Sequence, residues 1–70
     1  MNIKERFAKY TTEELRQAAT RLMDEALEYS EKTGEFMRAE NYEFADMARK
    51  TYKEKMDLYL DVKCALDARR

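Results

Sequence analysis

The sequence of 70 residues contains no histidine and no proline, and it has one glycine and one cysteine. Without histidine there is no serine–histidine or cysteine–histidine pair for nucleophilic catalysis. A zinc ion would have to bind carboxylates and one thiol, which is a poor ligand set. One glycine cannot build a phosphate-cradling loop, and one cysteine cannot form a disulfide within the chain. We therefore expect a protein that is not an enzyme and that binds neither a metal ion nor a cofactor.

Charge and hydropathy give few signs of a target. The chain carries 14 basic and 15 acidic residues, so no excess of basic charge indicates a nucleic acid or an acidic membrane as partner. No apolar run approaches the ~18 residues of a membrane span, and the start "MNIKERFAKY" lacks the apolar core of a secretory signal. We expect a cytoplasmic protein. The hydrophobic fraction of 44%, with three phenylalanines and five tyrosines, predicts packing rather than disorder.

The near absence of glycine and proline favours helix along nearly the whole chain. The clearest helix start is the segment "YTTEEL". Thr11 can act as the N-cap, Glu14 can bond back to it, and Tyr10 and Leu15 occupy the positions of a hydrophobic staple.

The position of the turn is the main structural question. From Leu15 onward apolar residues recur at steps of three and four, and Thr33, Phe36 and Met37 continue this phase beyond Gly34. The residues of this stripe before Gly34 are Leu15, Ala18, Ala19, Leu22, Met23, Ala26, Leu27 and Tyr29. We therefore favour helices at 11–40 and 42–68, with the turn at Asn41, over helices at 11–33 and 35–68. Asn41 suits a left-handed residue after the first helix or an N-cap of the second.

These helices predict an all-α fold, an antiparallel two-helix hairpin within a single domain of residues 1–70. Lys55 lies on the main apolar face of the second helix, where its ammonium either reaches solvent or pairs with Glu25 or Glu28. The remaining charges alternate at helical spacing, which is typical of a solvated face. The expected seam residues of the second helix are Phe44, Met47, Ala48, Thr51, Tyr52, Leu58, Tyr59, Val62, Ala65 and Leu66. The expected i, i+4 pairs are Arg21–Glu25, Glu28–Lys32, Lys50–Glu54 and Lys53–Asp57.

The second helix has a further apolar stripe, Met56, Leu60 and Cys64, on a different face. We expect Cys64 to be a small buried hydrophobe. Residues 1–10 could cover this stripe as a short helical segment, with Ile3 and Phe7 as its apolar contacts, or a partner chain could cover it. Because a lone hairpin buries little surface, we expect a homodimer resembling a four-helix bundle, with residues 1–10 in or beside the interface.

These features predict a small helical protein–protein interaction or regulatory module that acts through a helix face or a dimer groove. Ile3, Phe7, Tyr10, Tyr42, Met56, Leu60 and Cys64 are its candidate contacts. The alternative is a dimeric helical-hairpin regulator that binds RNA or DNA through Arg49, Lys50 and Lys53 in "RKTYKEK". Acidic neighbours interrupt that basic strip, and nucleic-acid binding needs several unopposed cations.

Overall fold

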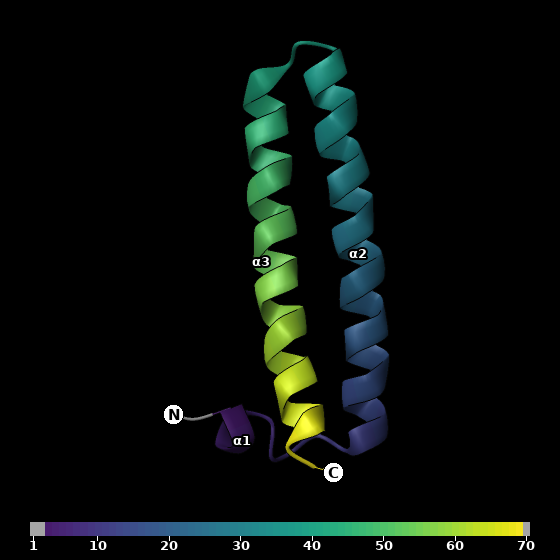
Figure 1. The fold of residues 1–70 in the computed structure, drawn as a ribbon, viewed down its shortest axis with the longest axis vertical. Helices are drawn as coiled ribbons and strands as arrows, with labels where there is room; N and C mark the ends of the chain where they lie inside the picture. Colours follow the sequence, from purple (N-terminus) through teal and green to yellow (C-terminus); the bar gives the residue numbers. More distant parts are fainter. Residues whose placement is uncertain (1–2, 70) are drawn as a thin grey trace.

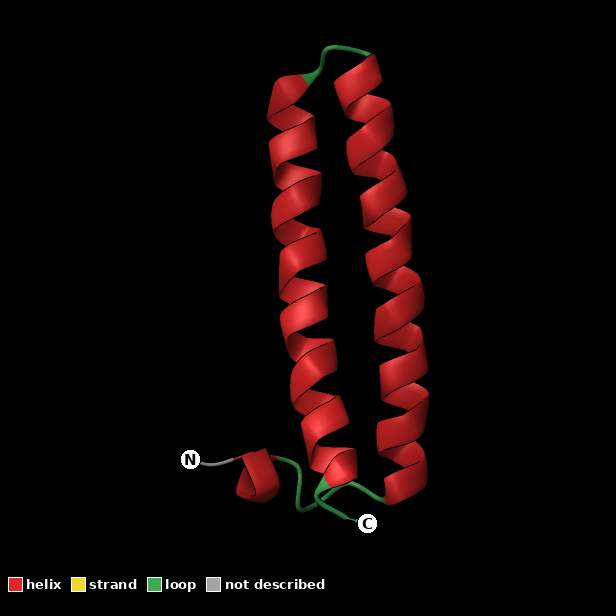
Figure 2. Ribbon diagram, viewed as in Figure 1, coloured by secondary structure: helices red, strands yellow, loops and turns green. Residues whose placement is uncertain are grey.

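The computed structural model describes residues 3–69, with the side chains of residues 5–69, and this part of the chain is all-helical. The order is α1 (Ile3–Arg6), α2 (Thr12–Arg38) and α3 (Tyr42–Asp67). Figure 1 shows α2 and α3 side by side and antiparallel, with α1 beside the far end of α3. Within residues 3–69, Figure 2 shows loops at the turn joining α2 to α3 and in short segments at the other end of the hairpin. The predicted helical hairpin is confirmed.

The start of α2 is held by a capping box. The Thr11 hydroxyl accepts a hydrogen bond from the Glu14 backbone N–H at 3.0 Å, and the Glu14 carboxylate accepts one from the Thr11 N–H at 2.9 Å. The bond from the Thr11 backbone lowers the pKa of the Glu14 carboxyl, because it favours the charged form. This confirms the helix start predicted from "YTTEEL".

The chain turns at residues 39–41 through a Schellman motif. Glu40 has φ 59°, its N–H donates to the Met37 carbonyl at 3.1 Å, and the Asn41 N–H donates to the Phe36 carbonyl at 2.8 Å. Asn41 has φ −93° and caps α3, with its side-chain oxygen accepting from the Phe44 N–H at 3.5 Å. Asn41 is therefore the N-cap, and the left-handed position before it belongs to Glu40.

We expect Glu40→Gly to stabilise the protein by about 0.5–1 kcal/mol. A left-handed conformation strains an L-residue by roughly 1–2 kcal/mol, whereas glycine adopts it freely at the cost of some chain entropy. Urea unfolding at one fixed protein concentration measures the change. Ala39→Gly is the matched control and should give no gain, because Ala39 has φ −83° and carries no such strain. Equal effects at the two positions would contradict the prediction.

Gly34 lies inside α2, where its flexibility is a cost. A Cβ added there would have its nearest contact with Arg38 Nη1 at 3.8 Å, which is ordinary van der Waals distance. We therefore expect Gly34→Ala to raise the free energy of unfolding by about 0.5–1 kcal/mol. Ser30→Ala, one turn earlier, should give a smaller gain. A loss of 1 kcal/mol or more at residue 34 would show that a close helix contact requires the glycine.

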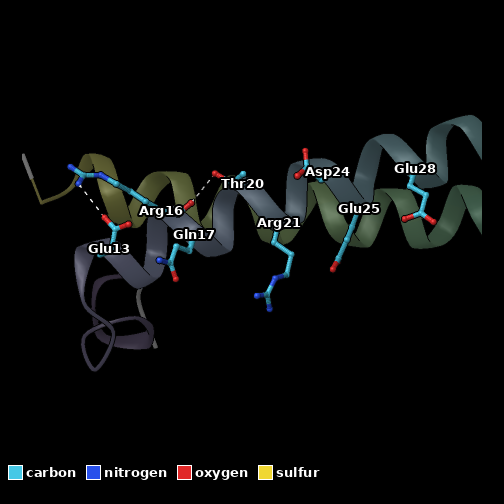
Figure 3. A pocket seen from close by; sticks show the side chains of 8 residues that line it. All are labelled: Glu13, Arg16, Gln17, Thr20, Arg21, Asp24, Glu25 and Glu28. Atoms are coloured by element: carbon cyan, nitrogen blue, oxygen red, sulfur yellow. Dashed lines mark hydrogen bonds and ion pairs between the residues drawn. The ribbon is translucent and has the colours of Figure 1, made fainter.

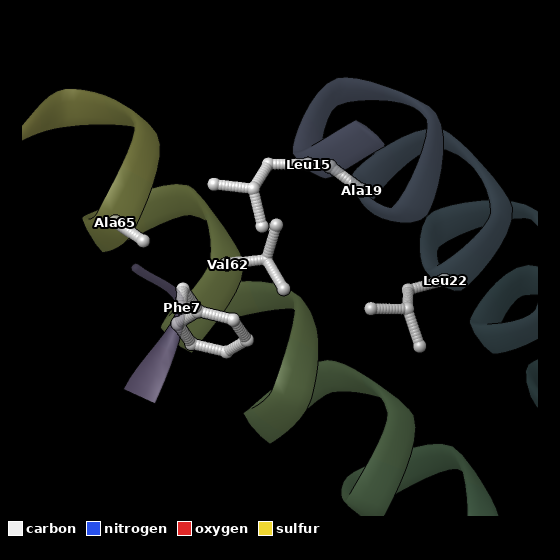
Figure 4. Close-up of a cluster of buried hydrophobic side chains, with 6 residues drawn as sticks. All are labelled: Phe7, Leu15, Ala19, Leu22, Val62 and Ala65. Atoms are coloured by element: carbon white, nitrogen blue, oxygen red, sulfur yellow. The ribbon is translucent and has the colours of Figure 1, made fainter. Parts of the chain in front are cut away.

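The core is unevenly distributed along the hairpin. Of the nine buried hydrophobic side chains among the described residues, five are alanines. The larger ones gather at the end opposite the turn, in one cluster (Figure 4). That cluster comprises Phe7, Leu15, Ala19, Leu22, Val62 and Ala65. Toward the turn the seam is closed by Ala26, Ala45 and Ala48, so the two helices contact each other there through small side chains.

Two residues of the second helix that were predicted to lie in the seam are instead exposed. Met47 is 62% exposed and Phe44 is 50% exposed, although the Phe44 ring still packs against Phe36 at 5.6 Å between centroids. The seam residues of packed helices repeat every 3.5 positions, so a stripe drawn at 3.6 drifts by about 20° per heptad. Extending the stripe from Val62 back to Met47 accumulates this error. Ala48 is buried as predicted, and Ala45 takes the next buried position toward the turn.

Candidate interaction surfaces

The N-terminal arm, residues 3–10, packs on one side of the hairpin base. Phe7 is only 7% exposed within the core cluster, and Arg6 forms an ion pair with Asp61 at 2.9 Å. Tyr10 is partly exposed, with its ring 6.3 Å from that of Phe7. Phe7 is thus a core residue. It can contact a partner, as was expected, only if the arm leaves this site. The Ile3 side chain lies outside the described residues.

Arg69 ties the end of the chain to the arm. Its guanidinium donates to the backbone carbonyls of Phe7 at 2.9 Å and Tyr10 at 2.8 Å, and to the Thr12 hydroxyl at 3.3 Å. A planar fork of donors can satisfy several acceptors at once, which suits arginine to this position. The sequence offered no signal for this contact, because the three acceptors lie 57–62 positions away along the chain.

The arm does not cover the stripe Met56, Leu60 and Cys64. It contacts α3 through Asp61, Val62 and Ala65, whereas Leu60 is 53% exposed and Cys64 is exposed. Cys64 is therefore not buried within the chain, contrary to the expectation. Of the two alternatives for covering this stripe, residues 1–10 do not provide the cover. Leu60 and Cys64 stand about 160° around the helix from Val62, so a segment packed near Val62 cannot reach them.

A broader apolar surface replaces the stripe. We call it the Met56 face and define it as Met23 and Leu27 of α2 with Met56, Tyr59 and Leu60 of α3. Met23 and Tyr59 line one groove of about 460 Å³ on this side of the hairpin, together with Ala19 and Leu66. Leu27 follows Met23 by one turn and is 55% exposed, while Met56 precedes Tyr59 by one turn.

The sequence pattern indicated only Met56 and Leu60 of the Met56 face. Tyr59 was expected in the seam of α3, and Met23 and Leu27 were expected in the stripe of α2, because they recur at steps of three and four. The alanines at 19 and 26 are the ones that face α3 at this height, and both are buried. A pattern of alternating small and large apolar residues was the available signal, since close helix packing needs the small ones inside.

Lys55 bridges the two long helices. Its ammonium lies 2.8 Å from a carboxylate oxygen of Glu25, and both side chains are about one-third exposed. The hydrogen bond and the charge of Glu25 raise the pKa of Lys55. Of the two expectations for Lys55, the cross-helix ion pair is therefore the one observed. It sets Glu25 opposite Lys55, in the same register that sets Phe36 opposite Phe44.

This ion pair predicts a loss of stability at high pH. The pKa of Lys55 is higher in the folded chain than in the unfolded one, so its contribution is full below the ordinary lysine pKa of ~10.4. The contribution disappears as the pH rises through the folded-state pKa. Urea unfolding between pH 9 and 12 should show a steeper decline for the wild type than for Lys55→Met. Lys50→Met should keep the wild-type slope, and a shared slope for all three would contradict the prediction.

The basic strip of α3 is only partly available. Arg49 pairs with Asp46 at 2.9 Å, while Lys50 and Lys53 are exposed. Tyr42, the neighbouring aromatic, is also exposed. Of the four predicted i, i+4 pairs only Glu28–Lys32 forms, at 3.3 Å, and Glu25 is engaged by Lys55 instead. Two lysines without ion pairs are few cations for binding a phosphate backbone.

The outer side of α2 forms a shallow hollow that is lined only by polar and charged side chains. Figure 3 shows these residues projecting from one helix: Glu13, Arg16, Gln17, Thr20, Arg21, Asp24, Glu25 and Glu28. Over residues 3–69, neither long helix has an apolar stretch sufficient to cross a bilayer. Within the same residues, no three histidine, cysteine, aspartate or glutamate side chains come together in a way that could hold a metal ion.

Comparison with known proteins gives no assignment. No protein-family model matches the chain, and no curated protein or solved structure matches it. The surfaces described above are therefore the basis for any functional interpretation.

Proposed function

We propose that this protein is a small non-catalytic interaction module that binds a helical protein partner through the Met56 face. The observation that carries the proposal is that Leu27 and Leu60 are each more than half exposed on the side of the hairpin that the arm leaves uncovered. Such a surface suits a partner helix that inserts apolar side chains between α2 and α3. We further propose that the module acts in the cytoplasm as a regulatory or accessory protein.

The composition of the Met56 face supports this use. Methionine side chains are flexible and polarizable, so Met23 and Met56 can adapt to the side chains of a partner. Tyr59 adds an aromatic ring with a polar tip, a residue type that is enriched at interfaces. Lys63 and Arg16 line the same groove and give the apolar centre a charged rim.

A pull-down with immobilised protein tests the proposal. Leu60→Glu should abolish capture of any specific partner, because it places a charge on the outer, α3 side of the Met56 face. Met47→Glu is the matched control: Met47 is also an exposed apolar residue of α3, but it lies outside the Met56 face. Circular dichroism should show that both variants stay helical. A partner that is retained by Leu60→Glu and lost with Met47→Glu would overturn the assignment of the binding face.

A further inference from the structure

We infer that the Met56 face binds a second copy of this chain in an antiparallel, two-fold symmetric dimer, in which the turns of the two hairpins lie at opposite ends. The inference rests on the proposed function in one respect, since it uses the same face. It names the occupant of that face and the orientation of the two chains. The arm remains on the outer side of each hairpin, where the structure places it.

The chain leaves more surface exposed than a compact monomer of its mass. The protein exposes 5567 Å². A compact monomer of its mass, 8.4 kDa, exposes about 4,600 Å². Its radius of gyration is 14.6 Å, against about 11 Å for a globular chain of this length. The excess of about 950 Å² is close to the ~800 Å² that each partner gives to a standard protein interface.

The apolar residues of the Met56 face are placed nearly symmetrically about the height of Glu25 and Lys55. Met23 and Leu27 lie two residues on either side of Glu25, which stands opposite Lys55. A two-fold axis at that height, perpendicular to the helices, sets Met23 of one copy against Leu27 of the other, and the reverse. The same axis brings the Met56 side chains of the two copies near each other. The apolar centre of each copy therefore covers that of its partner.

The charges at the two ends of the Met56 face favour an antiparallel dimer over one in which the two hairpins point the same way. Asp46 and Lys63 lie eight or nine residues on either side of residues 54–55, so the antiparallel arrangement places Lys63 of each copy beside Asp46 of the other. A two-fold axis along the helices would instead bring together residues that lie at the same height in the two hairpins. Arg16 and Lys63 line the same groove, so that arrangement would gather four cations at one height. Like charges across an interface oppose binding, and opposite charges favour it.

Both charges lie on the correct side of α3. Lys63 lines the groove of the Met56 face. Arg49 precedes it by two heptads and so points the same way, and Asp46 bonds to Arg49 at 2.9 Å. The Asp46–Arg49 pair is highly exposed, so Asp46 can exchange its partner at little cost.

A charge-reversal cycle tests the inference. Sedimentation equilibrium over a range of concentrations should show a dimer for the wild type. Lys63→Asp and Asp46→Lys should each weaken it about fivefold or more, because each introduces two like-charge contacts. The double variant should regain wild-type affinity. Residues 46 and 63 are about 26 Å apart along one helix, so this recovery can arise only between two chains.

Cross-linking gives a second measurement that does not depend on affinity. In a variant that combines Asp46→Cys, Lys63→Cys and Cys64→Ser, the thiol at position 46 of one copy should form a disulfide with the thiol at position 63 of the other on mild oxidation, identified by peptide mass mapping. Within one chain these positions are about 26 Å apart, well beyond the ~6 Å that a disulfide allows between Cα atoms. Asp46→Cys combined with Cys64→Ser is the control and should remain uncross-linked. Formation of 46–46 links would overturn the antiparallel arrangement.

The outcomes separate this inference from the proposed function. A chain that stays monomeric at all concentrations overturns the dimer. If Leu60→Glu still abolishes capture of another protein in that case, the proposed function stands without it. A dimer that Lys63→Asp and Asp46→Lys leave unchanged, or that the double variant does not restore, overturns the orientation.

Discussion

Leu15→Ala is expected to lower the free energy of unfolding by about 3 kcal/mol, the largest effect of any single truncation in this protein. Leu15 is 3% exposed and belongs to the cluster at the hairpin base. Removing three buried carbons there forfeits their transfer free energy and leaves a cavity. A chain of 70 residues has a total stability of only about 3–10 kcal/mol, so this single truncation removes between about a third and all of it.

Urea or thermal unfolding checks the Leu15 prediction, with an expected fall in Tm of about 12–24 °C. Met47→Ala is the matched control, because Met47 is 62% exposed and lies outside both the core cluster and the Met56 face. It should change stability by less than about 0.5 kcal/mol. If both variants lose similar stability, the base cluster is not the main source of folding free energy.

Phe7→Ala is expected to cost about 3 kcal/mol, the second largest effect, and to act through the arm. Among the described side chains of the arm, Phe7 is the one in the core cluster, between Leu15 on α2 and Val62 and Ala65 on α3. Truncating a buried phenylalanine typically costs 3–5 kcal/mol. The loss is expected at the low end, because the arm can detach while α2 and α3 stay together along the alanine seam.

Hydrogen exchange distinguishes detachment of the arm from global unfolding. The Tyr10 backbone N–H, which donates to the Phe7 carbonyl at 3.1 Å, should lose protection in Phe7→Ala. Amides in the middle of α2 should keep much more of theirs. Tyr10→Ala serves as control, because Tyr10 is 40% exposed and should cost less than about 1 kcal/mol. Uniform loss of protection along the whole chain would contradict an arm that can leave by itself.

Much of the fold was predictable because it follows from local rules. The capping box depends on residues only three positions apart, and both of its hydrogen bonds form. The apolar phase through Thr33, Phe36 and Met37 indicated that α2 continues past Gly34, and it does. The position of the turn set Glu25 and Glu28 opposite Lys55, and the structure shows that Glu25 is the partner.

The candidate site was less predictable, because the apolar stripe of a helix does not show which of its residues the neighbouring helix will bury. The stripe of α2 included Met23 and Leu27 together with Ala19 and Ala26. The alanines take the inside positions, which leaves Met23 half-buried and Leu27 exposed. Met47 was misplaced for the same reason, since a small error in the repeat accumulates over four turns.

The sequence by itself determined two helices of nearly equal length, the capping box that starts the first of them, and a turn at Asn41. These depend on interactions within a few residues and on a period that the chain carries along its whole length. Only the tertiary structure decided which side of the hairpin the arm covers. That choice depends on Phe7 entering the base cluster, on Arg6 meeting Asp61, and on Arg69 bonding to the Phe7 and Tyr10 carbonyls. These contacts join residues more than 50 positions apart, and they leave the Met56 face free.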